Sequence, residues 1–565
     1  MNKAENEMTK ELQIDRRNFL RASIAASTVA VTGSAMAQNT KASGTFPGRR
    51  LSQIAHDELE FELEEATISR LSDAMKSGEL TARSIAEKYL ARIEKVDKAG
   101  PSINSIIELN PDALKIADSL DAERKARGAR GPLHGIPVLI KDNIDTADKM
   151  MTTAGSLALE GSIALRDSFV AQRLREAGAV ILGKTNLSEW ANFRSSHSSS
   201  GWSGRGGQTR NPYVLDRNPC GSSSGSGAAT SANLCTVSVG TETDGSVVCP
   251  SSVNSLVGIK PTVGLISRAG IIPISHSQDT AGPMARTVTD AVILLTALAG
   301  VDPRDEATSA SPGSQRKASF DYTKFLDSNG LRGARIGVAR KFFGFNQHVD
   351  KLIGDAIDEM KRQGAVIIDK ADIPTLGKFD DSEFEVLLFE FKADLNKYLE
   401  GLGPSAPVHS LKEIIDFNEK NQEKELPFFG QDILEKSEAK GPLTTREYID
   451  ALAKNHRLAG AEGIDAVITK MNLDAIVAPT GGPAWPTDLI NGDHFVGGNV
   501  SSAPAVAGYP HITVPAGYVF GLPIGLSFFG RAFSEPTLIK LAYGFEQASK
   551  ARKPPRFLPT ISDFR

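Results

Sequence analysis

Two patterns of apolar residues alternate along most of the chain. Downstream of Thr81, a plausible N-cap residue, apolar residues recur at spacings of four, four and three, the period of one helix face. These residues are Ile85, Tyr89, Ile93 and Val96. Short apolar runs bounded by Gly or Pro instead predict buried strands. The runs are residues 138–140, 179–182, 365–368 and 475–478.

Helices are expected to precede two of these strands. The pattern predicts a helix over residues 168–178, before the second run, and another over 348–363, before the third. Because helices and strands alternate, the chain is expected to form an α/β layered core. A Pro-, Ser- and Asp-rich connection follows at residues 301–330, and residues 380–470 indicate a charged, mainly helical insertion on the core. Gly/Pro-rich turns of core-like composition are expected at residues 522–530.

The first residues have the order of an export signal. Arg16 and Arg17 are followed by Phe-Leu, a mildly apolar run over residues 22–31, and a small-residue cleavage pattern that ends at Ala37. This order predicts a twin-arginine signal peptide over residues 1–37, and a poorly fixed leader at 38–62.

The signal predicts that the mature protein is periplasmic or secreted. No segment after the signal reaches the 18 or so residues that span a bilayer without charges. We therefore expect no membrane attachment once the signal is cleaved.

Composition narrows the class of protein. The 565 residues include 64 Lys and Arg against 68 Asp and Glu, and 40% of the residues are hydrophobic. These values are typical of globular proteins, and the balanced charge argues against a nucleic-acid-binding surface. Three cysteines in a chain of this length do not make a disulfide scaffold. A large soluble enzyme is the expectation that remains.

A glycine- and serine-rich segment at residues 220–227 is the most informative stretch. Such a segment is often a flexible linker, but this one borders apolar, small-residue sequence rather than solvated segments. Residues 221–225 also match G-x-S-x-G, which would make Ser223 a nucleophile, and His511 is a candidate partner that nothing in the sequence ties to it. Two S-x-x-K matches, at 314–317 and 437–440, lie in polar stretches without companion motifs.

Short blocks spread over residues 65–550 resemble the amidase signature family. The most specific blocks are residues 221–226 and 240–246, with residues 135–143 upstream. The other matching blocks are residues 183–186, 258–262, 279–283, 508–510 and 521–525. Within the family, residues 188–193 and 207–213 resemble the bacterial peptide amidases.

The resemblance implies one amidase domain over residues 63–558, with the insertion around 380–470. It implies the amidase signature fold, an α/β fold whose large mixed β-sheet is covered by helices on both faces. This chain has Cys220 before the first motif glycine, and Ser224 and Asp244 where the family commonly has Gly. Polar side chains at these positions are expected to affect the detail of the pocket.

The family's Ser–cis-Ser–Lys triad corresponds to Ser246, Ser222 and Lys141. A serine hydroxyl needs a base to become a nucleophile, and a buried neutral lysine can serve because desolvation disfavours its ammonium form. Lys141 ends an apolar run, which is a setting of that kind. The resemblance also implies a cis peptide bond between Gly221 and Ser222, and substrate contacts from Ser222 and Ser223. Backbone N–H groups for the oxyanion are implied at Thr243, Asp244, Gly245 and Ser246.

We expect an exported amidase that forms an acyl-enzyme and removes ammonia from C-terminal peptide amides, acting as a monomer. Hydrolysis of aryl acylamides, fatty acid amides or cyclic amides stays open, as does an inactive amide-binding protein. A transamidating subunit fits less well, because such subunits work in the cytoplasm with partners. No cofactor or metal is expected, since the chain lacks H-E-x-x-H and has no two His at ligand spacing.

The cysteines lie close to the motif serines in sequence. Cys220 lies two residues before Ser222, and Cys249 lies three after Ser246. Because export after folding would bury the thiols first, we expect Cys220, Cys235 and Cys249 to be three buried thiols. A bridge between Cys220 and Cys249 is the alternative.

Overall fold

The computed structural model describes residues 61–310, 320–497 and 500–564. The predicted signal peptide at 1–37 and nearly all of the leader at 38–62 lie outside these residues. The chain divides into two units, residues 1–58 and 59–565, and every described element belongs to the second.

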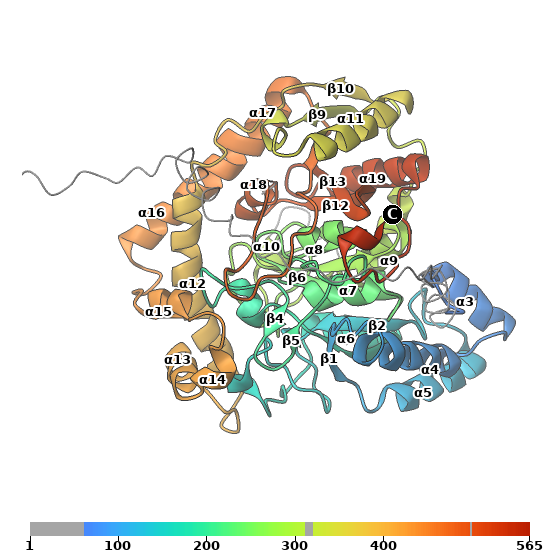
Figure 1. Cartoon of the computed structure of the whole chain (residues 1–565), viewed down its shortest axis with the longest axis vertical. Coiled ribbons are helices and arrows are strands. Elements are labelled where there is room, and N and C mark those ends of the chain that lie inside the picture. The colour runs from blue at the N-terminus through green and yellow to red at the C-terminus, as the bar shows by residue number, and fades with distance from the viewer. Residues whose placement is uncertain (1–60, 311–319, 498–499, 565) are drawn as a thin grey trace, which may run out of the picture. The chain divides into compact units, whose positions relative to one another are not determined.

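An eleven-stranded sheet runs through the second unit in the order β1-β3-β2-β6-β8-β7-β12-β13-β11-β9-β10 (Figure 1). Strand β2 is parallel to β3 and β6, and β9 is parallel to β10 and β11, whereas the other neighbours are antiparallel. The strands are β1 Ile106–Leu109, β2 Pro137–Lys141, β3 Val180–Thr185, β6 Val237–Glu242, β7 Val257–Lys260, β8 Thr280–Ala285, β9 Arg335–Val338, β10 Val366–Ile368, β11 Ala475–Pro479, β12 His511–Val519 and β13 Leu522–Phe529. A separate two-stranded sheet pairs β4 (Trp202–Ser203) with β5 (Gly207–Gln208).

Helices cover both faces of the sheet. Along β11, Ala475 and Val477 pack into one apolar cluster, whereas the alternate residues Ile476 and Ala478 pack into another. Because side chains alternate across a strand, both faces of β11 are buried. The prediction of an α/β fold with a mixed, doubly covered sheet is therefore confirmed.

The described α-helices are α3 Ile68–Ser77, α4 Ala82–Ile93, α5 Ala113–Arg127, α6 Phe169–Glu176, α7 Ser224–Ser231, α8 Val248–Val253, α9 Val288–Leu298, α10 Ala307–Ala310, α11 Gln347–Arg362, α12 Asp380–Gly401, α13 Leu411–Lys420, α14 Gln422–Glu425, α15 Asp432–Glu438, α16 Arg446–Asn455, α17 Asp465–Met471, α18 Ser502–Val506 and α19 Glu535–Ser549. Helix α4 begins with a capping box in which the Thr81 hydroxyl accepts from Ser84 N and the Ser84 hydroxyl accepts from Thr81 N. Within the described residues, no helix is long and apolar enough to cross a membrane.

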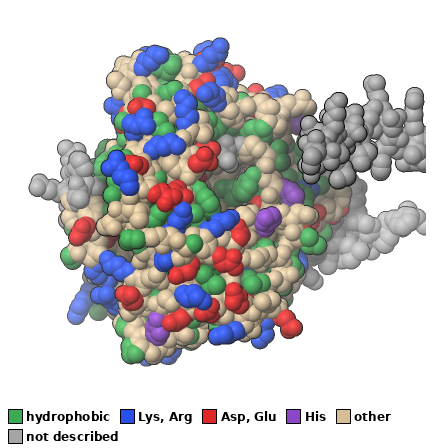
Figure 2. Space-filling view, turned by 90° about the vertical axis from the view of Figure 1, so that its left-hand side faces the viewer, with side chains coloured by type: hydrophobic (Ala, Val, Ile, Leu, Met, Phe, Trp, Pro, Cys, Tyr) green, Lys and Arg blue, Asp and Glu red, His purple; other side chains and the backbone are tan. Residues whose placement is uncertain are grey.

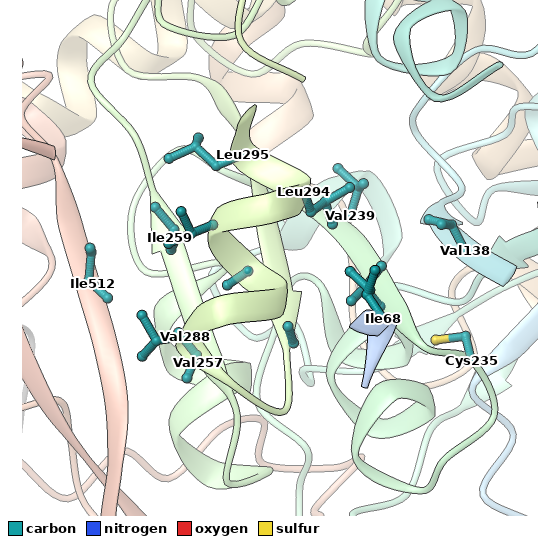
Figure 3. Close-up of a cluster of buried hydrophobic side chains, with 14 of the residues drawn as sticks. Ile68, Val138, Cys235, Val239, Val257, Ile259, Val288, Leu294, Leu295 and Ile512 are labelled. Atoms are coloured by element: carbon teal, nitrogen blue, oxygen red, sulfur yellow. The ribbon is translucent and has the colours of Figure 1, made fainter. Parts of the chain in front are cut away.

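The centre of the core lies where α9 packs on the middle strands (Figure 3). Val288, Leu294 and Leu295 of α9 belong to the same fully buried cluster as Val257 of β7 and Ile512 of β12. This helix is apolar on most sides, as expected of one enclosed by other elements.

The turns predicted at residues 522–530 are wrong. Residues Leu522–Phe529 form β13, which pairs with β12 on one side and β11 on the other. The turn falls earlier, where Phe520 (φ 49°) and Gly521 (φ 80°) adopt the left-handed conformation that a two-residue hairpin requires. Pairing on both sides overrides the weak strand preference of the local composition.

Residues 380–471 form the helices α12 to α17, joined by short connections and a π-helical segment at His456–Ile464. Helices α12, α13 and α15 share a buried apolar cluster with residues of the segments 154–193 and 272–274, and this cluster is distinct from the main cluster around the sheet. The side of the structure where these helices lie in Figure 1 carries Lys and Arg interspersed with Asp and Glu (Figure 2). The insertion therefore packs on the rest of the described structure through apolar clusters to which both contribute.

Candidate active site

Lys141 is the last residue of β2, beside the parallel strand β6. Because the carboxyl ends of parallel strands meet at one edge of a sheet, residues after β2 and after β6 come together there. Lys141 Nζ donates to Ser222 Oγ at 2.8 Å and to Thr241 Oγ1 at 2.8 Å. Its third acceptor is the Thr241 carbonyl at 3.4 Å. The ammonium group therefore meets only neutral oxygen atoms within the described residues.

This environment changes the pKa of Lys141. The side chain is fully buried, and desolvation lowers its pKa to about 7, although the negative charges of Asp279 and Glu242 act in the opposite direction. A lysine with such a pKa is neutral in a large fraction of molecules at neutral pH. It can therefore accept a proton from the hydroxyl that it contacts.

Ser222 lies in the turn that leads into α7. The peptide bond between Gly221 and Ser222 is cis, as expected from the resemblance. Ser188 N donates to the Ser222 carbonyl at 3.1 Å, and a Cβ atom on Gly221 would lie 2.2 Å from Ser188 Oγ. A larger residue at this position would therefore require the Ser188 side chain to move, and Ser222 beside it has its side chain buried next to Lys141.

Ser246 lies in the loop that follows β6, and it lines a cleft. Gly245 has φ +79°, a left-handed conformation that favours glycine. Glu242 fixes the far end of this loop by accepting from Val247 N at 2.7 Å and Val248 N at 3.0 Å.

Four consecutive backbone N–H groups in the Ser246 loop are available to bind a substrate oxygen. Within the described residues, the backbone N–H groups of Thr243, Asp244, Gly245 and Ser246 donate no hydrogen bond. Four consecutive donors at the floor of a cleft are the arrangement that stabilises an oxyanion.

The two serine loops are bonded to each other. Ser223 N donates to the Ser246 carbonyl at 3.2 Å. No hydrogen bond joins Ser222 Oγ to Ser246 Oγ among the described residues, and such catalytic bonds are often long before substrate binds. Ser223 is fully buried, and its hydroxyl donates to the Thr241 carbonyl at 3.0 Å and accepts from Thr241 N at 3.1 Å. It is absent from the residues that line the cleft.

A disulfide also links these loops. Cys220 and Cys249 are bonded to each other, with 6.0 Å between their Cα atoms, and Cys235 is buried and free. The prediction of three thiols is therefore wrong, and the alternative bridge is present. Assembly of the serine loops brings the two sulfur atoms together, which outweighs the argument from export that favoured thiols.

The cleft has a volume of about 310 Å³ and lies above Ser246. Apolar side chains from several elements line it, and these include Phe193, Ile274, Val253, Leu387, Trp485, Phe495 and Val496. No Lys, Arg or His is among its lining residues in the described structure, and Asp244 is the one acidic residue. Burial raises the pKa of the Asp244 carboxyl, which accepts from Ser502 Oγ at 2.8 Å.

Three polar residues that support the site were not singled out from the sequence. Thr241 contacts Lys141, and Asn143 Nδ2 donates to Thr241 Oγ1 at 3.0 Å. Asp279 accepts from Thr243 Oγ1 at 2.6 Å, and burial raises the pKa of Asp279 to about 6. All three lie inside the blocks that carry the resemblance, which was the available signal.

His511 does not belong to this site. It is buried on β12, where its Nε2 pairs with Ser527 Oγ at 2.6 Å, and burial lowers its pKa to about 3. Since the Ser223 hydroxyl bonds to the Thr241 backbone, neither residue supports the nucleophile-elbow alternative.

Among the described residues, His276, Glu390 and Asp394 are the one cluster with metal-ligand chemistry. The three side chains are already hydrogen-bonded to one another or to neighbouring residues. Asp394 Oδ2 lies 2.8 Å from His276 Nδ1, and Glu390 accepts from Tyr448 OH at 2.7 Å and from Ser275 Oγ at 2.5 Å. The cluster is a hydrogen-bonded network and lies outside the residues that line the Ser246 cleft.

Comparisons with known proteins agree with this geometry. A model of the amidase family matches residues 84–539. The structure of native peptide amidase from Stenotrophomonas maltophilia is similar with a TM-score of 0.84 and 51% identity, covering 88% of this chain and 99% of that one. A complex of peptide amidase PAM with the competitive inhibitor chymostatin matches with a TM-score of 0.84 and 52% identity, covering 88% of this chain and 100% of that one.

Curated relatives extend over most of the chain as well. A probable amidase of Arabidopsis thaliana is 46% identical over 88% of this chain and 93% of its own length. A putative amidase of Arthroderma benhamiae is 38% identical over 85% of this chain and 81% of its own length.

Proposed function

The chain belongs to the amidase family and is a hydrolase of carbon–nitrogen bonds, and we propose that it removes ammonia from C-terminal peptide amides. The observation that carries the catalytic roles is the 2.8 Å contact between the buried Lys141 Nζ and Ser222 Oγ, next to the cleft that Ser246 lines. We assign Lys141 as the base, Ser222 as the relay and Ser246 as the nucleophile.

The proposed reaction has two halves. Neutral Lys141 takes the proton of Ser222 Oγ, which takes that of Ser246 Oγ as the latter attacks the amide carbon. The oxygen that becomes negative receives hydrogen bonds from the free N–H groups at Thr243 to Ser246. The same relay returns the proton to the leaving nitrogen, so that ammonia departs and an ester to Ser246 remains. Water then cleaves the ester by the reverse relay and releases the acid.

The residues that line the cleft favour a substrate whose acyl group carries no charge next to the scissile amide. Because no cation lines it among the described residues, the cleft offers no partner for a free carboxylate near the reacting carbon. An amidated peptide C-terminus is neutral there, whereas free glutamine and asparagine carry a carboxylate. The similarity to a peptide amidase that binds chymostatin favours the same substrate class.

We also propose that the enzyme is exported and acts in the periplasm or outside the cell. The order of residues 1–37 supports this location, and the Cys220–Cys249 disulfide is of the kind that persists in oxidising compartments. With Arg16→Lys and Arg17→Lys, the protein should stay in the cytoplasm. The exported wild-type protein should begin at Gln38 by mass spectrometry, and unchanged export of the double variant would refute the assigned route.

Ammonia release from purified protein tests the substrate proposal. N-acetyl dipeptide amides should be hydrolysed faster than fatty acid amides, aryl acylamides or cyclic amides, and Ser246→Ala should abolish turnover. A fluorophosphonate probe should label the wild type and leave Ser246→Ala unlabelled. Faster turnover of another amide class would reassign the substrate. Absence of both turnover and labelling would instead indicate an amide-binding protein without catalysis.

A further inference from the structure

Three apolar residues of the chain segment that joins β11 to α18 line the cleft. Trp485 is buried, whereas Phe495 and Val496 have exposed fractions of 55% and 57%. The Trp485 and Phe495 rings lie 4.4 Å apart between centroids, and all three side chains line the cleft that holds Ser246. We call these residues the aromatic wall.

The aromatic wall is held in place by the half-buried carboxylate of Asp493. Asp493 Oδ1 accepts from Trp485 Nε1 at 3.3 Å and from Ser200 N at 3.0 Å, and Asp493 Oδ2 accepts from Ser200 Oγ at 2.5 Å. Asn218 N also donates to the Trp485 carbonyl at 2.7 Å. Since Asn218 lies two residues before Cys220, the wall is attached to the chain segment that carries Ser222.

The leaving group decides which part of a substrate meets this wall. In a primary amide the leaving nitrogen bears only hydrogen, so ammonia occupies little more than the space beside Ser246. The rest of the cleft must then face the acyl part of the substrate. Phe193, Ile274 and Leu387 also line the cleft, so that most of the side chains available to the acyl part are apolar.

We infer that the aromatic wall selects amides whose terminal residue has an apolar side chain, with Phe495 as the residue that determines this specificity. The inference rests on the proposed function. Phe495 is suited to this role because it lines the cleft with more than half of its surface exposed, while its ring packs against that of Trp485. Covering this ring with a substrate side chain removes apolar surface from water, which favours binding.

The test compares N-acetyl-phenylalanine amide, N-acetyl-leucine amide and N-acetyl-glycine amide. The wild type should favour the phenylalanine amide over the glycine amide in kcat/KM by about tenfold or more, the scale of small apolar differences in a pocket. Phe495→Ala should lower this ratio about fivefold or more, mainly by raising KM for the phenylalanine amide. Turnover of the glycine amide should stay within about twofold of the wild-type value.

Ile490→Ala is the matched control. Ile490 lies in the same segment with an exposed fraction of 81%, and it does not line the cleft. The control should keep the wild-type ratio, and because both positions are exposed, both variants should fold. A wild type without preference, an unchanged ratio in Phe495→Ala, or an equal loss in Ile490→Ala would each overturn the inference. Wild-type protein that hydrolyses none of the three amides would overturn the proposed function itself.

Discussion

Two buried cations, Lys141 and Arg194, show how the same fold treats a charge differently in two regions. Both side chains are fully buried. Lys141 belongs to the edge of the sheet where the serine loops meet, and Arg194 lies where the helical insertion packs on the core. One environment makes the proton removable, whereas the other uses the charge to hold two segments together.

Arg194 is surrounded by partners that favour its charge. Its Nη1 donates to Glu189 Oε1 at 2.7 Å and to the Glu425 carbonyl at 2.5 Å, and its Nη2 donates to the Phe429 carbonyl at 3.2 Å. The guanidinium also lies 4.1 Å from the centre of the Phe429 ring. Because arginine keeps its proton in proteins, this contact serves structure and not proton transfer.

Lys141 has no comparable partner among the described residues. Its hydrogen bonds go to two hydroxyls and one carbonyl, and burial lowers its pKa to about 7. The difference teaches that burial alone does not decide the role of a cation. Between these two residues, the difference is a carboxylate in contact with Arg194 and, in the described structure, none in contact with Lys141.

Replacing Lys141 with Met should give the largest effect, and it should be an effect on rate. Loss of a general base should reduce kcat/KM by about 10² to 10⁴, with little change in the thermal midpoint, because an apolar chain of similar length replaces an unpaired buried charge. Steady-state kinetics and thermal unfolding of the same preparation check both parts. Retained activity would remove Lys141 from the mechanism.

Replacing Arg194 with Met should reverse that outcome. Removing one partner of a buried ion pair leaves Glu189 uncompensated and should cost about 3–5 kcal/mol of unfolding free energy. Denaturant unfolding measures the change, and kcat at low temperature should stay near the wild-type value. Arg83→Met, at an exposed pair with Glu87, is the control and should shift the midpoint little. An equal shift in both variants would contradict the contrast.

Removing the disulfide tests whether a covalent bond stabilises the region of the two serine loops, as the Arg194 ion pair stabilises the contact with the insertion. The double variant Cys220→Ser, Cys249→Ser should lose about 3.6 kcal/mol, the scale expected for a closed loop whose ends are 29 positions apart. Its kcat should fall as well, because the bridge joins the loops of Ser222 and Ser246.

Reduction provides the matching measurement on the wild type. A dithiol reductant should lower its kcat reversibly, and the double variant should be insensitive to the same treatment. Cys235→Ala, which keeps the bridge, should remain sensitive. Wild-type kinetics that do not change after complete reduction, shown by thiol titration, would mean that the bridge only stabilises the fold.

The sequence was sufficient for features that depend on local pattern. The strand that ends at Lys141 was located from an apolar run that is visible in a short window. Ser222 and Ser246 were assigned through the resemblance of their short blocks to the amidase signature family. Thr241 and the Cys220–Cys249 bridge were not assigned, because each depends on contacts between segments far apart in the chain. Thr241, for example, meets Lys141 across 100 positions.

The same reason explains the strand at Leu522–Phe529. Its Gly and Pro residues favour turns locally, and only its pairing with β11 and β12 makes it a strand. The insertion illustrates the intermediate case. Its mainly helical character was expected from the sequence, whereas the position of Glu425 beside Arg194 follows from packing that no local window contains.

The pH dependence of catalysis, which needs no substitution, separates the two cations most directly. Since neutral Lys141 is the active form and its pKa is about 7, kcat/KM should rise with pH, about tenfold per unit below 7, and level off above it. Arg194 takes no part in the proposed proton transfer, so Arg194→Met should keep the same profile. In Lys141→Met the rise near pH 7 should disappear from the residual activity. A midpoint near 7 in that variant would assign the titration to another group, such as Asp279, whose carboxyl has a pKa raised by burial to about 6.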